Sequence, residues 1–221
     1  MFLFYIIFTI LFLPITIFFP TKVIGRKNLK KKGRTIIISN HHSNLDPVLL
    51  DIKLHKRIRF LSKKELFNNK IKAFFFGFVC GCVPVNRGAT DLTATKKILS
   101  LLKDEKQIGI FPEGTRNTTT EEMLELKNGV CLFALKTKTP ITPTYLIRKS
   151  KFLRRNVLLV GKPFELSEFY NEKITKDVLV NAGKVVSEKM DELKRLYEEQ
   201  QLEKQTIKQL KKMKKAQKND K

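Results

Sequence analysis

Residues 35–46, TIIISNHHSNLD, begin as an apolar, β-branched run and end in a polar turn that carries two histidines and an aspartate. The apolar half is typical of a buried strand in an α/β sheet. A second stretch of this kind, residues 108–116 with the sequence IGIFPEGTR, follows later in the chain. Because α/β folds place their chemistry at strand ends, the two polar segments are candidates for one shared site.

The first polar segment offers a base and a carboxylate. His41 and Asp46 are five residues apart, so on one continuous helix they would face different ways. If Asp46 caps the next helix and Pro47 is its first residue, the loop can fold back and let the carboxylate accept the imidazole N–H. The other ring nitrogen then stays free to take a proton from a hydroxyl. Ser43 is expected to bond the turn backbone, and His42 to pack or hydrogen-bond beside the site.

Composition limits the class of protein and its partners. The 221 residues allow one domain with a real core, and 44 Lys and Arg against 21 Asp and Glu give a net charge of +23. That charge favours an acidic partner: nucleic acid, anionic lipid or an acidic carrier protein. Three cysteines in apolar surroundings lack the spacing of a zinc or redox site, so core packing in a reducing compartment is expected.

The N-terminus is a candidate membrane segment. Residues 1–20, MFLFYIIFTILFLPITIFFP, carry no charge and as one helix would be about as long as a bilayer core is thick. Pro14 is expected to kink this helix and Pro20 to end it, which leaves open whether it spans the bilayer or dips into one leaflet. Seven Lys and Arg residues lie between positions 22 and 34. The positive-inside rule therefore predicts a cell-membrane protein with its catalytic domain on the cytoplasmic face.

Apolar runs alternate with amphipathic stretches beyond residue 33, which predicts an α/β fold with a mixed central sheet flanked by helices. Strands are expected at 34–39, 57–61, 79–85, 107–111, 141–147 and 156–161, and helices at 47–54, 63–78, 90–103, about 127–137, and 174–216. An N-terminal membrane helix and a long C-terminal helix complete the expected fold. The expected parts are a membrane anchor (1–21), a catalytic domain (22–173) and a basic C-terminal helix and tail (174–221). Residues 214–221 are expected to fray.

Four short segments occur in a recognisable order. They are residues 40–46 (NHHSNLD), 81–87 (GCVPVNR), 111–116 (FPEGTR) and 139–143 (TPITP). This series resembles the four motif blocks of the glycerolipid acyltransferases, most closely the bacterial 1-acylglycerol-3-phosphate acyltransferases. The first and third blocks are specific, whereas the second and fourth are weak alone. The resemblance implies that family's α/β fold and covers residues from about 35 to about 145.

The resemblance also implies roles for individual residues. His41 would deprotonate the sn-2 hydroxyl of lysophosphatidate as it attacks an acyl thioester, and Asp46 would orient His41. The residues implied to hold the glycerol phosphate are Arg87, Glu113, Gly114, Thr115 and Arg116. Glu113 cannot bind phosphate itself, so it is expected to bond the glycerol or orient Arg116. Lys127 is a further phosphate candidate, although a plain surface lysine is the commoner case.

The implied partners are membrane lipids, a lysophospholipid acceptor, and acyl-CoA or acyl carrier protein as co-substrate, with no metal, no other cofactor and no nucleic acid. Three alternatives stay open on the sequence. The acceptor could be glycerol 3-phosphate or another lysophospholipid. The chain could be a non-enzymatic basic protein that binds membrane or nucleic acid, although it has no recognition helix or RNA-binding aromatic motif. The same His–Asp pair could also activate water in a thioester or ester hydrolase.

Overall fold

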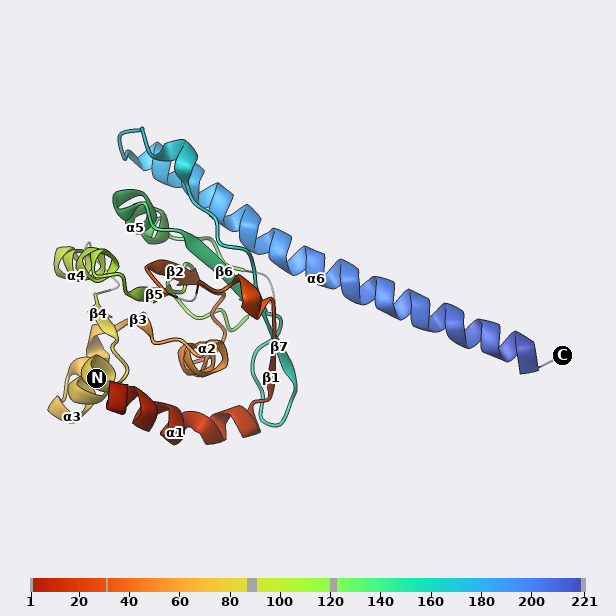
Figure 1. The fold of residues 1–221 in the computed structure, drawn as a ribbon. Helices are drawn as coiled ribbons and strands as arrows, with labels where there is room; N and C mark the ends of the chain where they lie inside the picture. Colours follow the sequence, from red (N-terminus) through yellow and green to blue (C-terminus); the bar gives the residue numbers. More distant parts are fainter. Residues whose placement is uncertain (1, 31, 87–90, 120–122, 220–221) are drawn as a thin grey trace.

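One seven-stranded sheet organises the chain, with the strand order β1-β7-β6-β2-β5-β3-β4 (Figure 1). The computed structural model describes residues 2–30, 32–86, 91–119 and 123–219. The strands are β1 (Thr21–Ile24), β2 (Thr35–Ile38), β3 (Ile58–Lys63), β4 (Val83–Val85), β5 (Gln107–Ile110), β6 (Ile141–Leu146) and β7 (Asn156–Val160). All neighbouring strands pair in parallel except β6 and β7, which are antiparallel. The prediction of a mixed central sheet is confirmed.

Helices cover both faces of this sheet (Figure 1). The α-helices are α1 (Phe2–Phe18), α2 (Asp46–Leu54), α3 (Lys70–Ala73), α4 (Leu92–Lys103), α5 (Gly129–Thr137) and α6 (Lys176–Asn219). The described residues also form a π-helix, η3 (Phe74–Val79), and the 3-10 turns η1 (Arg26–Asn28), η2 (Lys64–Phe67) and η4 (Ser167–Phe169). In Figure 1, α4, α5 and the first part of α6 lie over one face, and α2 and α1 lie over the other. The sheet is therefore the middle of three layers, as expected for an α/β domain.

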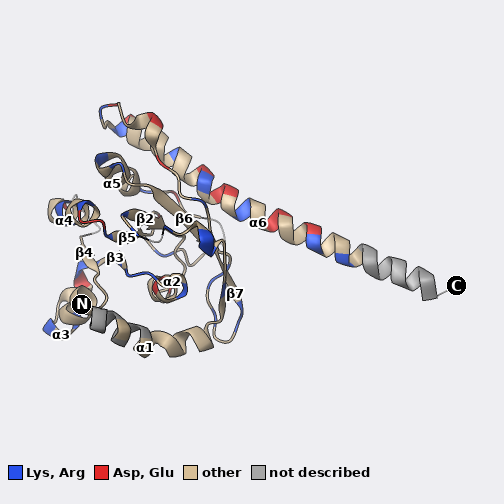
Figure 2. Cartoon of the chain, in the orientation of Figure 1, with Lys and Arg blue, Asp and Glu red and all other residues tan. Residues whose placement is uncertain are grey.

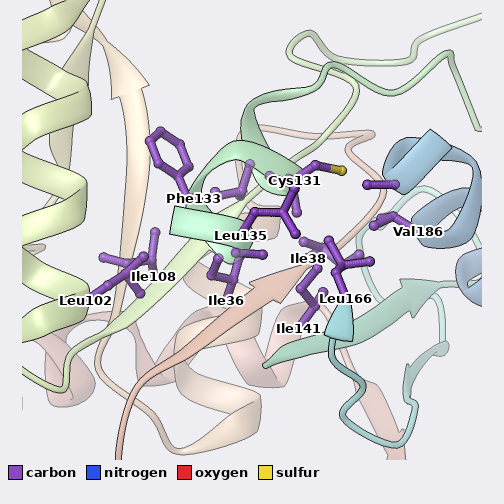
Figure 3. Close-up of a cluster of buried hydrophobic side chains, with 14 of the residues drawn as sticks. Ile36, Ile38, Leu102, Ile108, Cys131, Phe133, Leu135, Ile141, Leu166 and Val186 are labelled. Carbon is purple, nitrogen blue, oxygen red and sulfur yellow. The ribbon is translucent and has the colours of Figure 1, made fainter. Parts of the chain in front are cut away.

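The alternation of side chains along β2 divides the core in two. Ile36 and Ile38 join a large cluster between the sheet and α4, α5 and α6, which also contains Cys131 and Val186 (Figure 3). Ile37 points the other way, into a smaller cluster with residues of α2 and β3. All three isoleucines are at most 1% exposed. Since both faces of β2 are buried, its sequence is a continuous apolar run rather than an alternating one.

The N-terminal segment forms a helix of 17 residues, α1, that continues through Pro14 and ends at Phe18. Within the described ranges, no helix has both the length and the hydropathy needed to cross a membrane. The sequence left open whether the membrane helix expected over residues 1–20 spans the bilayer or dips into one leaflet, and the first of these alternatives is corrected. The helix packs instead beside α2 and η3, with the ring centroids of Phe12 and Phe75 6.0 Å apart.

Several boundaries differ from those expected. The strand expected at 79–85 forms only at Val83–Val85, because the preceding aromatic run closes into the π-helix η3. β1 was not expected as a strand. Helix α2 begins one residue early, with Leu45 in the capping position. Helix α6 continues to Asn219, three residues beyond the expected end at 216.

Candidate active site

The two polar segments meet at one edge of the sheet, because β2 and β5 are parallel neighbours whose last residues, Ile38 and Ile110, are paired. The loop after β2 is fixed to β6 by Asn40. Its Oδ1 accepts from the backbone N–H of Leu146 at 2.8 Å, and its Nδ2 donates to the carbonyl oxygen of Leu146 at 2.9 Å. His41 follows directly, so its backbone position is set by the ends of two strands.

His41 and Asp46 form the predicted pair. The imidazole Nδ1 lies 3.0 Å from Asp46 Oδ2, and both side chains are buried. The same oxygen accepts the backbone N–H groups of His42 at 2.7 Å and Ser43 at 2.6 Å. Three donors on one oxygen fix the position of the carboxylate. With Nδ1 donating to Asp46, Nε2 is the ring nitrogen that can accept a proton.

Glu113 is part of the frame around His41. Its Oε1 accepts the backbone N–H of His41 at 2.8 Å, and its Oε2 accepts that of Leu124 at 3.1 Å. The side chain is 2% exposed, and burial raises its pKa above the usual range while the two hydrogen bonds oppose that rise. Both carboxylate oxygens are thus occupied by backbone donors. In this geometry Glu113 holds the backbone of His41, and its expected role toward glycerol or Arg116 stays a prediction.

The second histidine supports the same loop, as expected. His42 Nε2 accepts from Asn40 Nδ2 at 2.9 Å, and His42 Nδ1 lies 3.3 Å from the carbonyl oxygen of Asn117. The backbone N–H of Asn117 in turn donates to the carbonyl oxygen of His41 at 2.7 Å. Ser43 Oγ accepts from the backbone N–H of Leu45, which is the turn role expected for it. The segment that carries the base is therefore braced on several sides.

Two cavities open beside His41, and both are lined by Phe111, whose ring stacks on the imidazole with centroids 4.0 Å apart. The first cavity, of about 620 Å³, runs between β5, α4 and α5. Its apolar wall consists of Leu61, Val85, Ala94, Ile98, Ile110, Val130 and Phe133. Lys127 and Gly129, at the start of α5, add a cation and a helix N-terminus to the lining. Asp91 adds a carboxylate to the same lining, so a long apolar group with a polar head fits this combination.

The second cavity, of about 450 Å³, opens between α2, β3 and η3. Arg116 and Lys63 contribute positive charge to its lining, and Phe76 contributes an aromatic wall. Asp51 also lines it, with Oδ1 accepting the backbone N–H of Ile58 at 2.7 Å. Burial raises the pKa of Asp51 to about 7, although that hydrogen bond opposes the rise. Near neutral pH, Arg116 and Lys63 therefore dominate the charge of this cavity.

The structure brings together most of the residues singled out in the sequence. Gly114 lines the first cavity and adopts φ +67°, a left-handed conformation that disfavours a larger residue, and a Cβ there would also displace the flexible end of the Lys127 side chain. Arg116 lines the second cavity, and Thr115 is exposed beside it. Lys127 lines the first cavity rather than plain surface. Arg87 lies outside the described residues.

Asn40, Phe111 and Asn117 are site residues whose roles the sequence analysis did not identify. Asn40 and Phe111 stand within the quoted motifs, so their position was visible but their partners were not. Asn117 follows Arg116 as one of a polar series, and nothing local distinguishes it. Their contacts join segments about 75 to 106 residues apart in the chain, which only the folded arrangement reveals.

Comparison with known proteins shows the family of the chain. Residues 20–147 match the family model described as Acyltransferase. A 1-acyl-sn-glycerol-3-phosphate acyltransferase of Borreliella burgdorferi is 31% identical over 62% of this chain and 54% of its own length. One of Bacillus subtilis is 30% identical over 67% of this chain and 75% of its own length. The chain thus spans between about half and three quarters of these two curated relatives.

A solved structure is similar in fold. The 1-acyl-sn-glycerophosphate (LPA) acyltransferase PlsC from Thermotoga maritima superposes with a TM-score of 0.58 at 22% identity, covering 79% of this chain and 72% of that one. This likeness concerns the arrangement of sheet and helices. The α/β sheet flanked by helices is therefore an architecture already seen in a solved protein.

Proposed function

Since the chain belongs to the Acyltransferase family, we propose that it transfers an acyl chain from a thioester to the sn-2 hydroxyl of 1-acylglycerol 3-phosphate, forming phosphatidic acid. The observation that carries this proposal is the His41 Nδ1 to Asp46 Oδ2 contact of 3.0 Å between two cavities. The names of the curated relatives support the same acceptor. Acyl-CoA and acyl carrier protein are both acidic donors that suit the net charge of +23.

The reaction needs one proton transfer in each direction. The acceptor hydroxyl oxygen bonds to the thioester carbonyl carbon while His41 Nε2 takes the hydroxyl proton. Asp46, fixed by its three donors, stabilises the imidazolium that forms. When the tetrahedral intermediate collapses, the C–S bond breaks and the imidazolium returns the proton to the leaving thiolate. The chain's own side chains supply every proton transfer in this sequence.

The two cavities divide the substrates. The first, with its apolar wall, takes the acyl chain of the donor, and Lys127 at its rim attracts an anionic head. The second holds lysophosphatidate, whose phosphate accepts hydrogen bonds from the Arg116 guanidinium. Its sn-2 hydroxyl then lies between Arg116 and His41, both of which line this cavity. Arg87 is a second candidate for the phosphate.

The substrate is itself a membrane lipid, and α1 is the natural contact with the bilayer. Its exposed side chains include Ile10, Leu11, Leu13 and Ile17, each at least half exposed. An apolar helix of 17 residues that lies in one leaflet buries this face without crossing the bilayer. We place the enzyme on the cytoplasmic face of the cell membrane, because the basic residues that follow α1 favour that side.

A donor-by-acceptor assay tests the proposal. Purified full-length protein is incubated with acyl-CoA or acyl carrier protein of several chain lengths and with lysophosphatidate, glycerol 3-phosphate or lysophosphatidylcholine. The expected result is phosphatidic acid from lysophosphatidate, at a higher rate than any other product. Release of free fatty acid independent of the acceptor would identify a hydrolase, and no transfer from either donor to any acceptor would overturn the proposal.

A further inference from the structure

The connection between β6 and β7 ends in two exposed apolar side chains. Phe152 is 62% exposed and Leu153 is 63% exposed at the tip of this hairpin. Leu153 also adopts φ +54°, a left-handed conformation that costs a branched side chain about 1 kcal/mol or more and that glycine adopts without strain. A strained and solvent-exposed leucine gains nothing from the fold itself. The hairpin tip therefore has the properties of a surface that a lipid layer or another molecule covers.

Basic residues surround this tip. Five cations lie within residues 148–155 and no acidic residue does; they are Arg148, Lys149, Lys151, Arg154 and Arg155, and all are exposed. None forms a salt bridge with a carboxylate of the described residues. Figure 2 shows this basic loop beside the uncharged part of α1. Two apolar side chains within a ring of unpaired cations match the chemistry of an anionic lipid surface.

The tip lies beside α1. The backbone N–H of Leu153 donates to the carbonyl oxygen of Phe18 at 2.6 Å, and the rings of Phe152 and Phe18 stack with centroids 5.3 Å apart. At the other end of α1, Phe74 and Ile71 in the α3–η3 segment are 55% and 78% exposed. Figure 1 shows α3, α1 and the hairpin loop in a row along the same side of the molecule.

We propose that the β6–β7 hairpin tip is a second membrane contact, which inserts Phe152 and Leu153 into the leaflet that receives α1 and binds anionic lipid headgroups through its five cations. The inference rests on the proposed function, which places a lipid substrate at this side of the molecule. It adds an element that lies after the four sequence motifs and outside the predicted anchor.

The contact also orients the active site. The hairpin begins where β6 ends at Leu146, and Asn40 hydrogen-bonds both backbone groups of Leu146 one residue before His41. Seating the hairpin in the leaflet therefore fixes the distance between the bilayer surface and the base. Two separate contacts, α1 and the hairpin, prevent the domain from rotating about either one.

A fluorescence experiment on the full chain tests this contact directly. The sequence contains no tryptophan, so Phe152→Trp introduces a single reporter that keeps an aromatic ring at the stack with Phe18. Val180→Trp is the matched control, because Val180 is 40% exposed near the start of α6, at the opposite end of the molecule from α1 (Figure 1). The probes are phosphatidylcholine vesicles with and without phosphatidylglycerol, each also prepared with brominated acyl chains.

The expected result is a blue shift and bromine quenching at position 152 on phosphatidylglycerol vesicles, and neither at position 180. An unshifted emission at position 152 on vesicles that carry the protein, or a failure of the full chain to co-sediment with them, would overturn the inference. Acyl transfer measured in detergent micelles reports separately on the proposed function. Its absence there would contradict that proposal while leaving the fluorescence result to stand.

Two loss variants separate lipid contact from folding. Leu153→Gly relieves the positive φ, so the fold is retained, and vesicle partitioning is expected to fall severalfold while activity in micelles is unchanged. Replacing Lys149, Lys151 and Arg154 with Gln should weaken binding to anionic vesicles by about fivefold per charge at low salt. The matched control replaces Lys103, Lys106 and Lys136, exposed at the opposite edge of the sheet, with Gln. Equal losses from both triple variants would contradict a specific role for the hairpin.

Discussion

Glu113 and Arg116 stand three residues apart in one turn, yet their side chains have opposite surroundings. Glu113 is buried and accepts the backbone N–H groups of His41 and Leu124, whereas Arg116 is exposed at the second cavity. The first holds the base in place, and the second is available to a substrate phosphate. Substituting Glu113 is therefore expected to disturb the position of the base, whereas substituting Arg116 is expected to weaken substrate binding.

Glu113→Gln keeps one acceptor oxygen and places an amide N–H₂ against the other backbone donor. Because that buried donor loses its partner, the free energy of unfolding is expected to fall by about 1–3 kcal/mol. The turnover number should fall with it, since the backbone of His41 is released. Urea unfolding and acyl-transfer kinetics measure both quantities. A variant with unchanged stability and a raised KM for the acceptor would instead support the glycerol contact expected from the sequence.

Arg116→Ala removes the cation proposed to hold the acceptor phosphate. The expected result is a drop in kcat/KM for lysophosphatidate of about 10- to 100-fold, since a charge-assisted hydrogen bond contributes about 1.5–3 kcal/mol. Stability should be unchanged, because the side chain is exposed. Steady-state kinetics with varied acceptor provide the measurement, and Arg195→Ala, exposed on α6, is a matched control. Equal kinetics in wild type and Arg116→Ala would place the phosphate elsewhere.

Asp51 predicts a pH dependence of stability. Burial raises its pKa from 3.8 to about 7, so between these values the folded protein holds a proton that the unfolded chain has released. Stability contributed by this group is therefore fully present below about pH 4 and is lost as the pH rises through about 7. Asp51→Asn keeps the oxygen that accepts from Ile58 N–H and removes the titration. Urea unfolding at pH 5 and pH 8 should show a smaller loss in the variant, and parallel losses would refute the assignment.

The role of a residue could be predicted from the sequence only where its interaction partner lies in the same motif. The His41–Asp46 contact is short-range, so its spacing and the helix start at Pro47 were enough to predict it. The hydrogen bonds of Glu113 to the backbone groups of His41 and Leu124 were not predicted, because those groups belong to other segments. Every residue except proline has a backbone N–H group, so the identity of a residue does not show whether its N–H donates to a distant side chain.

At the scale of elements, α4 and α5 wall the first cavity, and α4 provides a test of what that cavity holds. Ala94 is 4% exposed and lines it, so Ala94→Leu should shorten the space for an acyl chain. The expected result is a shift in donor preference toward shorter chains with the KM for lysophosphatidate unchanged. Lys97→Leu, on the exposed side of the same helix, is the matched control.

Competition between acyl-CoA donors of different lengths measures that preference. If Ala94→Leu alters the acceptor KM instead, the two cavities are assigned the wrong way round. If both variants leave donor preference unchanged, the acyl chain does not occupy the first cavity. Either result would change which cavity holds which substrate. The roles of His41 and Asp46 are tested separately by the His41→Ala variant.

The elements with strong apolar periodicity were predicted well, and those set by tertiary contacts were not. β2 and β5 are four-residue strands within apolar runs between turn residues, so their existence follows from the sequence. β1 is a short strand that exists because it pairs with β7, far along the chain. The helix expected over 63–78 forms as η2, α3 and the π-helix η3, and η3 extends to Val79, so that only Val83–Val85 of the strand expected at 79–85 forms. Long-range pairing therefore decided β1.

At the scale of the whole molecule, one side of the sheet carries the chemistry and the proposed lipid contacts together. The loops that follow β2, β5 and β6 hold the base, the Arg116 turn and the basic hairpin, and the segment after β3 forms η2, α3 and η3. Parallel pairing places the carboxyl ends of these strands at the same edge. A lipid acceptor can thus reach His41 from the bilayer without the domain leaving its surface.

The first part of α6 belongs to this unit, because Val178, Ala182, Val186 and Met190 lie in the main core. From Leu202 to Gln209 every side chain is exposed, and the helix leaves the domain (Figure 1). The sequence analysis anticipated a long C-terminal helix from its spacing of apolar residues. It did not reveal how many turns would be buried, since that depends on the width of the sheet beneath.

The central claim is that His41, held by Asp46, removes the proton from the acceptor hydroxyl. The most direct measurement is the turnover number of His41→Ala for acyl transfer to lysophosphatidate, with wild type and Lys136→Ala assayed in parallel. The account predicts a loss of about 10²- to 10⁴-fold for His41→Ala, with the protein still folded and its vesicle binding unchanged. A folded His41→Ala protein that keeps a turnover number close to that of wild type would contradict it.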